Sequence, residues 1–246
     1  MIVGIAPLDL ALLAGAAFAA GLVRGFSGFG TAMVYLPVAG QILSPFAALA
    51  TIVIFDLVGP LPNVPRALRD GAPRDVLRLV AGLVVTLPLG LYTLTLVAPE
   101  VFRYAVSLTA FFLVACLVLG LRYRGRLTPP LIYTTGGLSG FLFGIAGLPG
   151  PPVILLYMAS TLPAYVVRAN TLLFLFLCDV ALLPTLALLG RLDGSAVLIG
   201  GLLIAPNVLG NVIGARLFRP GHERTYRWVA YAVITASALS GLPVWD

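Results

Sequence analysis

The sequence predicts an all-α integral membrane protein, built from two inverted five-segment repeats with glycine-broken or short re-entrant helices. Three observations point to this fold class: apolar stretches run along the whole chain, glycine clusters interrupt some of them, and the second half resembles the first. Of the 246 residues, 60% are hydrophobic and 10% are charged, and the mean hydropathy is +1.07. So few charged side chains cannot cover a soluble domain of this size. We therefore expect one transmembrane domain over residues 1–246, with the lipid bilayer as its partner.

Ten apolar segments can be separated along the chain, five in each half. A helix that crosses the hydrocarbon layer needs about 20 apolar residues. Several segments reach that length, whereas the shorter ones adjoin glycine clusters, which is typical of discontinuous helices. The segments are residues 8–24, 31–43, 46–62, 76–98 and 101–121, then 131–146, 150–160, 165–189, 195–217 and 225–243.

Internal similarity indicates a duplication. At a constant shift of 119 residues, three glycines of the first half fall on three of the second, namely Gly21, Gly25 and Gly28 on Gly140, Gly144 and Gly147. The first repeat is predicted to cover residues 1–126 and the second residues 127–246. Because each repeat has an odd number of segments, the two would be inserted in opposite orientations.

The arginines predict the orientation of the chain, which carries a net charge of +6. With the N-terminus outside, the cytoplasmic loops hold most of them, as the positive-inside tendency requires, and only Arg103 and Arg191 fall outside. We therefore expect a multi-pass protein of the cell (inner) membrane with both termini extracytoplasmic, and no nucleic-acid partner. The cytoplasmic set is Arg66, Arg69, Arg74, Arg78, Arg122, Arg124, Arg126, Arg168, Arg216, Arg219, Arg224 and Arg227.

Two glycine-rich stretches each precede a new helical segment. Unpaired amides and the positive end of the helix dipole make a helix N-terminus a binding site for anions. We expect the amides of residues 27–31 and 147–150 to hold a small anion between them. The alternative is that the glycines only let helices pack closely. The candidate ligands in these stretches are Ser27, Gly28, Gly30, Thr31, Gly147 and Gly150.

The two stretches resemble the duplicated signature of the sulfite exporter TauE/SafE family. The motifs are Gly25-Phe-Ser-Gly-Phe-Gly30 and Ser139-Gly-Phe through Gly147-Leu-Pro-Gly-Pro-Pro152. The resemblance extends over essentially the whole chain. It implies a secondary transporter, not an enzyme, that carries small sulfur-containing anions such as sulfite or sulfonates, including sulfoacetate. An anion channel or a structural membrane subunit is the alternative, because glycine-broken helices also line pores.

Charged side chains interrupt three apolar segments. Arg24 could pair with the substrate anion, or its long side chain could reach the cytoplasmic interface. Asp56 and Asp179 lie in the third and eighth segments. Buried carboxyl groups can carry protons, so both are candidates for proton coupling, and the alternative is a structural pair with an arginine.

Amide side chains supply a further candidate ligand. Asn170 falls opposite Thr51 in the repeat and follows the segment after the second glycine stretch, so we predict that it binds the anion. Asn207 and Asn211 are four residues apart and share one helix face, where we expect them to join helices.

Other functions find less support. Gly25-Phe-Ser-Gly28 also fits the motif of intramembrane serine proteases, but the single histidine, His222, lies in a basic loop and the chain has no lysine to act as a base. No phosphate-binding loop for ATP is present. Cys116 and Cys178 lie in apolar segments without partners at metal-ligand spacing. We therefore expect no cofactor and no metal.

Overall fold

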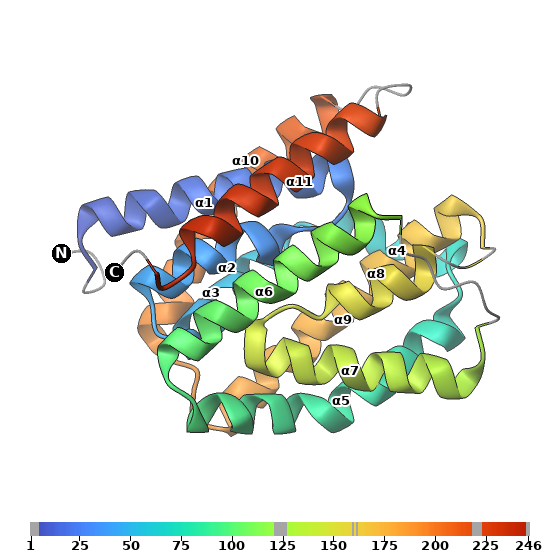
Figure 1. Cartoon of the computed structure of the whole chain (residues 1–246), viewed down its shortest axis with the longest axis horizontal. Helices are drawn as coiled ribbons and strands as arrows, with labels where there is room; N and C mark the ends of the chain where they lie inside the picture. Colours follow the sequence, from blue (N-terminus) through green and yellow to red (C-terminus); the bar gives the residue numbers. More distant parts are fainter. Residues whose placement is uncertain (1–4, 121–126, 159, 161, 218–222, 245–246) are drawn as a thin grey trace.

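The computed structural model describes residues 5–120, 127–158, 160, 162–217 and 223–244, and Figure 1 shows that these form a bundle of helices. This confirms the predicted all-α class. The helices are α1 (Pro7–Ser27), α2 (Thr31–Ile42), α3 (Pro45–Asp56), the short 3-10 helix η1 (Leu61–Asn63), α4 (Val64–Asp70), α5 (Pro73–Leu96), α6 (Pro99–Val118), α7 (Pro129–Ala146), α8 (Gly150–Met158), α9 (Ala164–Leu188), α10 (Gly194–Leu217) and α11 (Glu223–Ser240).

Proline and glycine set many of the helix ends. Helices α1, α3, α5, α6 and α7 each begin at a proline, whose fixed φ suits the first helical position and whose missing amide would be unpaired there. Helices α1 and α7 both end at a left-handed glycine, Gly28 with a φ of 83° and Gly147 with a φ of 69°. These caps stop each helix directly before the loop that leads into a short second helix.

Five of the described helices are long and apolar enough to cross a membrane, namely α1, α5, α6, α9 and α10. Three predicted segments differ. The first is a 21-residue helix that continues through Arg24 to Ser27. The third ends at Asp56, after which η1 and α4 continue at an angle of 49°. The last has an apolar part, Trp228–Ser240, shorter than a membrane span, because charged residues occupy its first turns.

The helices pack in a reciprocal arrangement. In Figure 1, α1 and α10 run side by side along one edge, α5 and α7 along the opposite edge, and the short helices α2, α3 and α8 lie between them; these two pairs share the most extensive helix contacts. In each pair, the first segment of one predicted repeat contacts the fourth segment of the other. The repeat boundaries 1–126 and 127–246 stay a prediction, which this exchange of partners supports.

Glycines let the paired helices approach closely. A Cβ atom at Gly21 would clash with the carbonyl oxygen of Asn207, and one at Gly210 with that of Phe18, which joins α1 to α10. Gly140 of α7 meets the carbonyl oxygen of Leu83 in the same way on α5. Several glycines of the two stretches are therefore helical, and they pack helices rather than form loops.

Replacing Gly21 with alanine should destabilise the protein strongly. The added methyl group meets backbone atoms, so the two helices must separate, at a cost of about 3 kcal/mol or more. Gly15→Ala is the matched control, because no atom lies within 4 Å of a Cβ at that position on the same helix. Thermal denaturation in detergent should show a much lower midpoint for Gly21→Ala alone, and equal midpoints for the two variants would contradict the packing.

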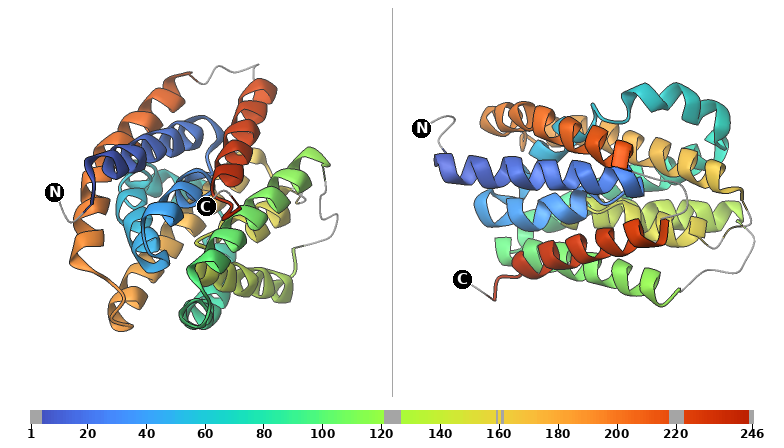
Figure 2. Two further views of the ribbon diagram at one scale, coloured as in Figure 1. Left: turned by 60° about the vertical axis from the view of Figure 1, so that its left-hand side comes forward. Right: turned by 90° about the horizontal axis from the view of Figure 1, so that it is seen from above.

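The first turn of α1 and the last turn of α11 lie at the same end of the bundle. Figure 1 and the right-hand view of Figure 2 show this, and Figure 1 shows α4 at the opposite end. Helix α4 and the first turns of α5 carry Arg66, Arg69, Arg74 and Arg78. The predicted cytoplasmic residues Arg122, Arg124, Arg126 and Arg219 lie outside the described residues, as do the side chains of Arg224 and Arg227.

Cysteine labelling would test the predicted orientation. In intact cells, Asp193→Cys should react with a membrane-impermeant maleimide, whereas Arg69→Cys should react only after the membrane is opened. Both positions are exposed, and the elements that carry them, the turn between α9 and α10 and helix α4, lie at opposite ends of the bundle (Figure 1). The native Cys116 and Cys178 are buried, so they should give little background. Labelling of Arg69→Cys from outside would reverse the orientation.

Candidate functional site

The two glycine loops meet at one small, partly open cavity between the helices. Its volume is about 50 Å³, and roughly 10 to 15 Å³ on this measure holds one water molecule. The cavity therefore has room for a few water molecules or one small oxyanion. It is lined by Arg24, Phe29, Gly30, Thr31, Ala32, Met33, Ile52, Asp56, Phe143, Gly147, Leu148, Pro149, Gly150, Ile154, Leu175 and Asp179.

Two helices begin at the cavity. The first loop covers Gly28 to Gly30 and leads into α2, whose first residue is Thr31, and the second leads into α8 at Gly150. The first amides of a helix have no carbonyl one turn earlier to bond, so they can donate to a ligand. Pro151 and Pro152 have no amide, so α2 offers more donors than α8. Both helix N-termini also place the positive ends of their dipoles there.

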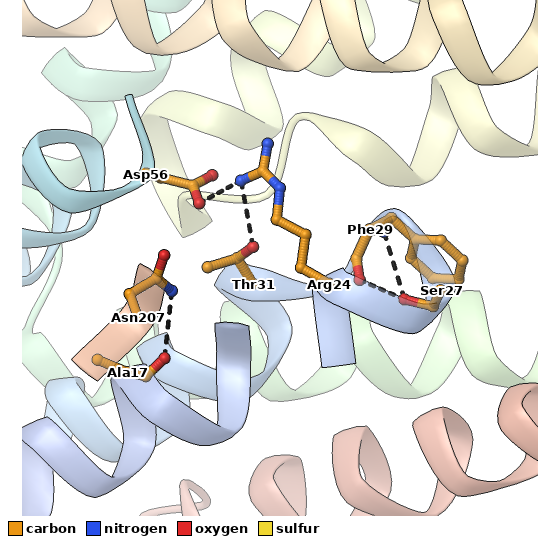
Figure 3. A network of polar contacts seen from close by, with 7 residues as sticks. All are labelled: Ala17, Arg24, Ser27, Phe29, Thr31, Asp56 and Asn207. Atoms are coloured by element: carbon orange, nitrogen blue, oxygen red, sulfur yellow. Dashed lines mark hydrogen bonds and ion pairs between the residues drawn. The ribbon is translucent and has the colours of Figure 1, made fainter. Parts of the chain in front are cut away.

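Arg24 carries the positive charge of the cavity. Its Nη1 forms an ion pair with Asp56 of α3 and donates a hydrogen bond to Thr31 Oγ1 at 3.3 Å (Figure 3). Arg24 and Asp56 are 8% and 9% exposed, so the pair is almost completely shielded from solvent. Arg24 thus points into the protein instead of reaching the interface. In this state its charge is balanced by a carboxylate.

Asp179 of α9 brings a second carboxyl group to the cavity. It is 7% exposed, and its Oδ2 has no hydrogen-bond partner among the residues that the structure describes. Asp56 and Asp179 come from the third segments of the two predicted repeats. Each has a cavity-lining apolar residue four positions earlier on the same helix, Ile52 and Leu175 respectively. The cavity thus holds two carboxyl groups and a single guanidinium group, a set that can exchange protons and bind an anion.

Most of the predicted site residues come together at this cavity. Arg24, Asp56 and Asp179 line it through their side chains, and the loop residues among its lining are Gly30, Thr31, Gly147 and Gly150. Gly28, which ends α1, is not part of the lining. The structure therefore gathers candidates from five helices, although they are separated by up to 155 positions in the sequence.

Besides Gly28, two predicted ligands do not line the cavity. The Ser27 hydroxyl group lies 2.7 Å from the carbonyl oxygens of Val23 and Phe29, and its side chain points away from Arg24 (Figure 3). Asn170 accepts a hydrogen bond from the Ala72 amide at 2.7 Å, which ties α9 to the turn before α5. Asn207 donates to the Ala17 carbonyl oxygen, so it joins α10 to α1 as expected.

The apolar residues that line the cavity were not predicted from the sequence. Phe29, Met33, Phe143 and Ile154 contribute to it, together with Ile52 and Leu175. Only the last two carried a signal, since they lie one turn before a buried carboxyl group. An apolar wall excludes bulk water and strengthens the electrostatic interactions inside.

The serine protease alternative gains no support from the described residues. Ser27 is bonded to backbone oxygens of its own loop and lies outside the cavity lining. His222, the single histidine, lies outside the described residues.

The fold and the cavity define a class: a multi-pass membrane protein with a small cavity that holds three charged side chains between broken helices, as in transporters. The family comparison agrees. Residues 13–241 match the family described as sulfite exporter TauE/SafE, so the chain belongs to that family. It is therefore a membrane transporter of an anion-exporter family. Comparison with curated proteins and with solved structures gave no match.

Proposed function

We propose that this chain is a secondary transporter that carries sulfite or small organosulfonates, such as sulfoacetate, across the inner cell membrane, driven by an ion gradient. The observation that supports it most is the buried Arg24 in a small cavity onto which two helix N-termini open. A sulfur oxyanion presents several acceptor oxygens and a negative charge, which match the amides, the Thr31 hydroxyl group and the guanidinium group.

The expected binding strength is moderate, as transport requires. A hydrogen bond to a charged group contributes about 1.5 to 3 kcal/mol, so a few such bonds offset part of the dehydration of the anion and still let it leave. A cluster of cations would hold the anion too tightly. Among the cavity-lining residues, Arg24 is the one with a positively charged side chain.

Asp56 and Asp179 are the groups that we propose for coupling to protons. Carboxyl groups buried in a membrane bundle commonly mark proton pathways. Both line the same cavity as Arg24, so a change of protonation would alter the charge that the substrate meets. The sequence contains no loop for ATP, so the energy would come from a gradient.

Uptake of radiolabelled sulfite, sulfoacetate and sulfate into proteoliposomes would test this function. We expect saturable uptake of at least one sulfur anion that rises when a proton gradient is imposed and disappears when a protonophore collapses it. Conductance without saturation or coupling would indicate a channel instead. Asp56→Asn and Asp179→Asn should each change the pH dependence, and no change in either would refute their role in coupling.

A further inference from the structure

The charged groups of the cavity restrict the anions that the site would bind, an inference that rests on the proposed function. We infer that the site binds a singly charged oxyanion together with one proton, and that Asp56 is the group that accepts this proton. The anion replaces the Asp56 carboxylate on Arg24, and the carboxylate is neutralised as it is released. Hydrogen sulfite and simple sulfonates fit this rule. Sulfate, the sulfite dianion and sulfoacetate, which carries a second negative group, fit it poorly.

The positive charge of Arg24 is already paired within the protein. Its guanidinium group is paired with Asp56 and also donates to Thr31, and both partners are buried. The chain has no lysine, and among the residues that the structure describes no other basic side chain lines the cavity. An entering anion must therefore compete with Asp56 for Arg24.

An anion that binds Arg24 would leave the Asp56 carboxylate without its partner. A buried charge that loses its partner destabilises a protein by about 3 to 5 kcal/mol, more than one new hydrogen bond returns. Protonation removes that penalty, because a neutral carboxyl group needs only hydrogen-bond partners. Binding of the anion and uptake of a proton by Asp56 should therefore occur together.

The total charge of the cavity favours a monoanion over a dianion. Asp179 has no cation of its own there and its Oδ2 has no partner in the described part of the chain, so we expect it to hold a proton already. The empty site then has one positive and one negative charge. Adding a monoanion and a proton leaves the sum at zero, whereas adding a dianion and a proton leaves an unbalanced charge in an apolar cavity.

No other titratable group around the carboxyl groups offers an easier exchange. The tyrosines of the short helices, Tyr35 and Tyr157, and the thiol of Cys178 are buried and do not line the cavity. Helix α10, which packs against α3, carries the buried amide Asn207, whose side chain donates to the Ala17 carbonyl oxygen of α1. Arg216 of α10 does not line the cavity either. The same holds for the charged residues of α4 and α5, which are Arg66, Arg69, Asp70, Arg74, Asp75 and Arg78.

Calorimetry on the purified protein would test the inference. Methanesulfonate is titrated in imidazole and in Tris, which differ in ionisation enthalpy and, unlike common sulfonate buffers, cannot compete for the site. We expect uptake of about one proton per anion bound and an affinity for methanesulfonate at least about tenfold higher than for sulfate. Binding of methanesulfonate without proton uptake, or equal affinity for sulfate, would overturn the inference and leave the proposed function standing.

Two variants identify the proton acceptor. Asp56→Asn should bind methanesulfonate without proton uptake. Asp179→Asn should still take up a proton on binding, because Asp179 would be neutral before and after this step, so its effect on the pH dependence of transport would arise at another step of the cycle. If Asp179→Asn abolishes proton uptake instead, the assignment to Asp56 is wrong. If Asp56→Asn does not fold, the proton count of the unaltered protein and of Asp179→Asn still decides the question. No binding of methanesulfonate, sulfite or sulfate by the folded protein would refute the proposed function, and this inference with it.

Discussion

Replacing Arg24 with glutamine is expected to abolish anion binding and to lower the free energy of unfolding by about 3 to 5 kcal/mol. The binding loss follows because Arg24 is the cation that lines the cavity. The stability loss follows because Asp56 is 9% exposed and would lose the cation that balances its buried carboxylate. Binding of radiolabelled sulfite to detergent-purified protein and denaturation of the same samples would measure both effects.

A double variant separates the two effects. Arg24→Gln combined with Asp56→Asn leaves no charge unpaired, so its stability should return to within about 1 kcal/mol of the unaltered protein, while binding stays absent. Arg69→Gln is a matched control, since Arg69 is exposed and does not line the cavity, and it should change stability by less than about 0.5 kcal/mol. Normal sulfite binding by the double variant would show that Arg24 is not a ligand.

Replacing Gly147 with alanine is expected to weaken anion binding at least tenfold and to destabilise the protein by about 2 to 4 kcal/mol. Two causes add. The φ of Gly147 is 69°, which an L side chain rarely adopts, and the new methyl group would meet the side chains of Leu36 and Leu49, the latter at 2.6 Å. The α7–α8 loop must then move, and it carries the second wall of the cavity.

Gly190→Ala isolates the conformational part of this effect. Gly190 has a φ of 64°, but no atom lies within 4 Å of a Cβ there, and the residue is not part of the cavity lining. It should lose about 1 kcal/mol of stability and bind sulfite normally. Similar results for both alanine variants would mean that the packing around Gly147 does not position the site.

Gly28 was predicted from the sequence to be a ligand, but it does not line the cavity. A side chain there would also be strained, because its φ is 83°, but no atom lies within 4 Å of a Cβ. Gly28→Val should therefore act through the backbone conformation of the α1 cap and not by filling the cavity. We expect it to be the milder of the two valine variants at Gly28 and Gly147, as measured by sulfite affinity.

Hydrophobic pattern and glycine position predicted most of the fold. Segments such as 76–98 and 195–217 correspond closely to α5 and α10. The first segment was predicted to end at residue 24, whereas α1 continues to Ser27, with Gly25 packed against α10. Such contacts join residues far apart in the chain, and local sequence does not contain them. The break after Asp56 was missed for the same reason.

The residues that form the site were predicted better than the contacts among them. The glycine loops and the buried carboxyl groups were visible as departures from an apolar background. A pair between a buried carboxyl group and an arginine was the stated alternative, and the structure shows one between Asp56 and Arg24. The sequence did not indicate these two partners, because their pairing depends on how α1 and α3 pack. Ser27 turns away since its hydroxyl group can bond the carbonyl oxygen of Val23 one turn earlier, a competition that sequence does not decide.

Locating a bound anion would test the central claim most directly. Selenite has the shape and charge of sulfite, and selenium scatters X-rays anomalously. In crystals grown with selenite, we predict one anomalous peak in the cavity, beside the Arg24 guanidinium group and between Thr31 and Gly150. A peak only elsewhere, for example in the hollow lined by Arg66 and Arg168, with the cavity empty at saturating selenite, would contradict the account.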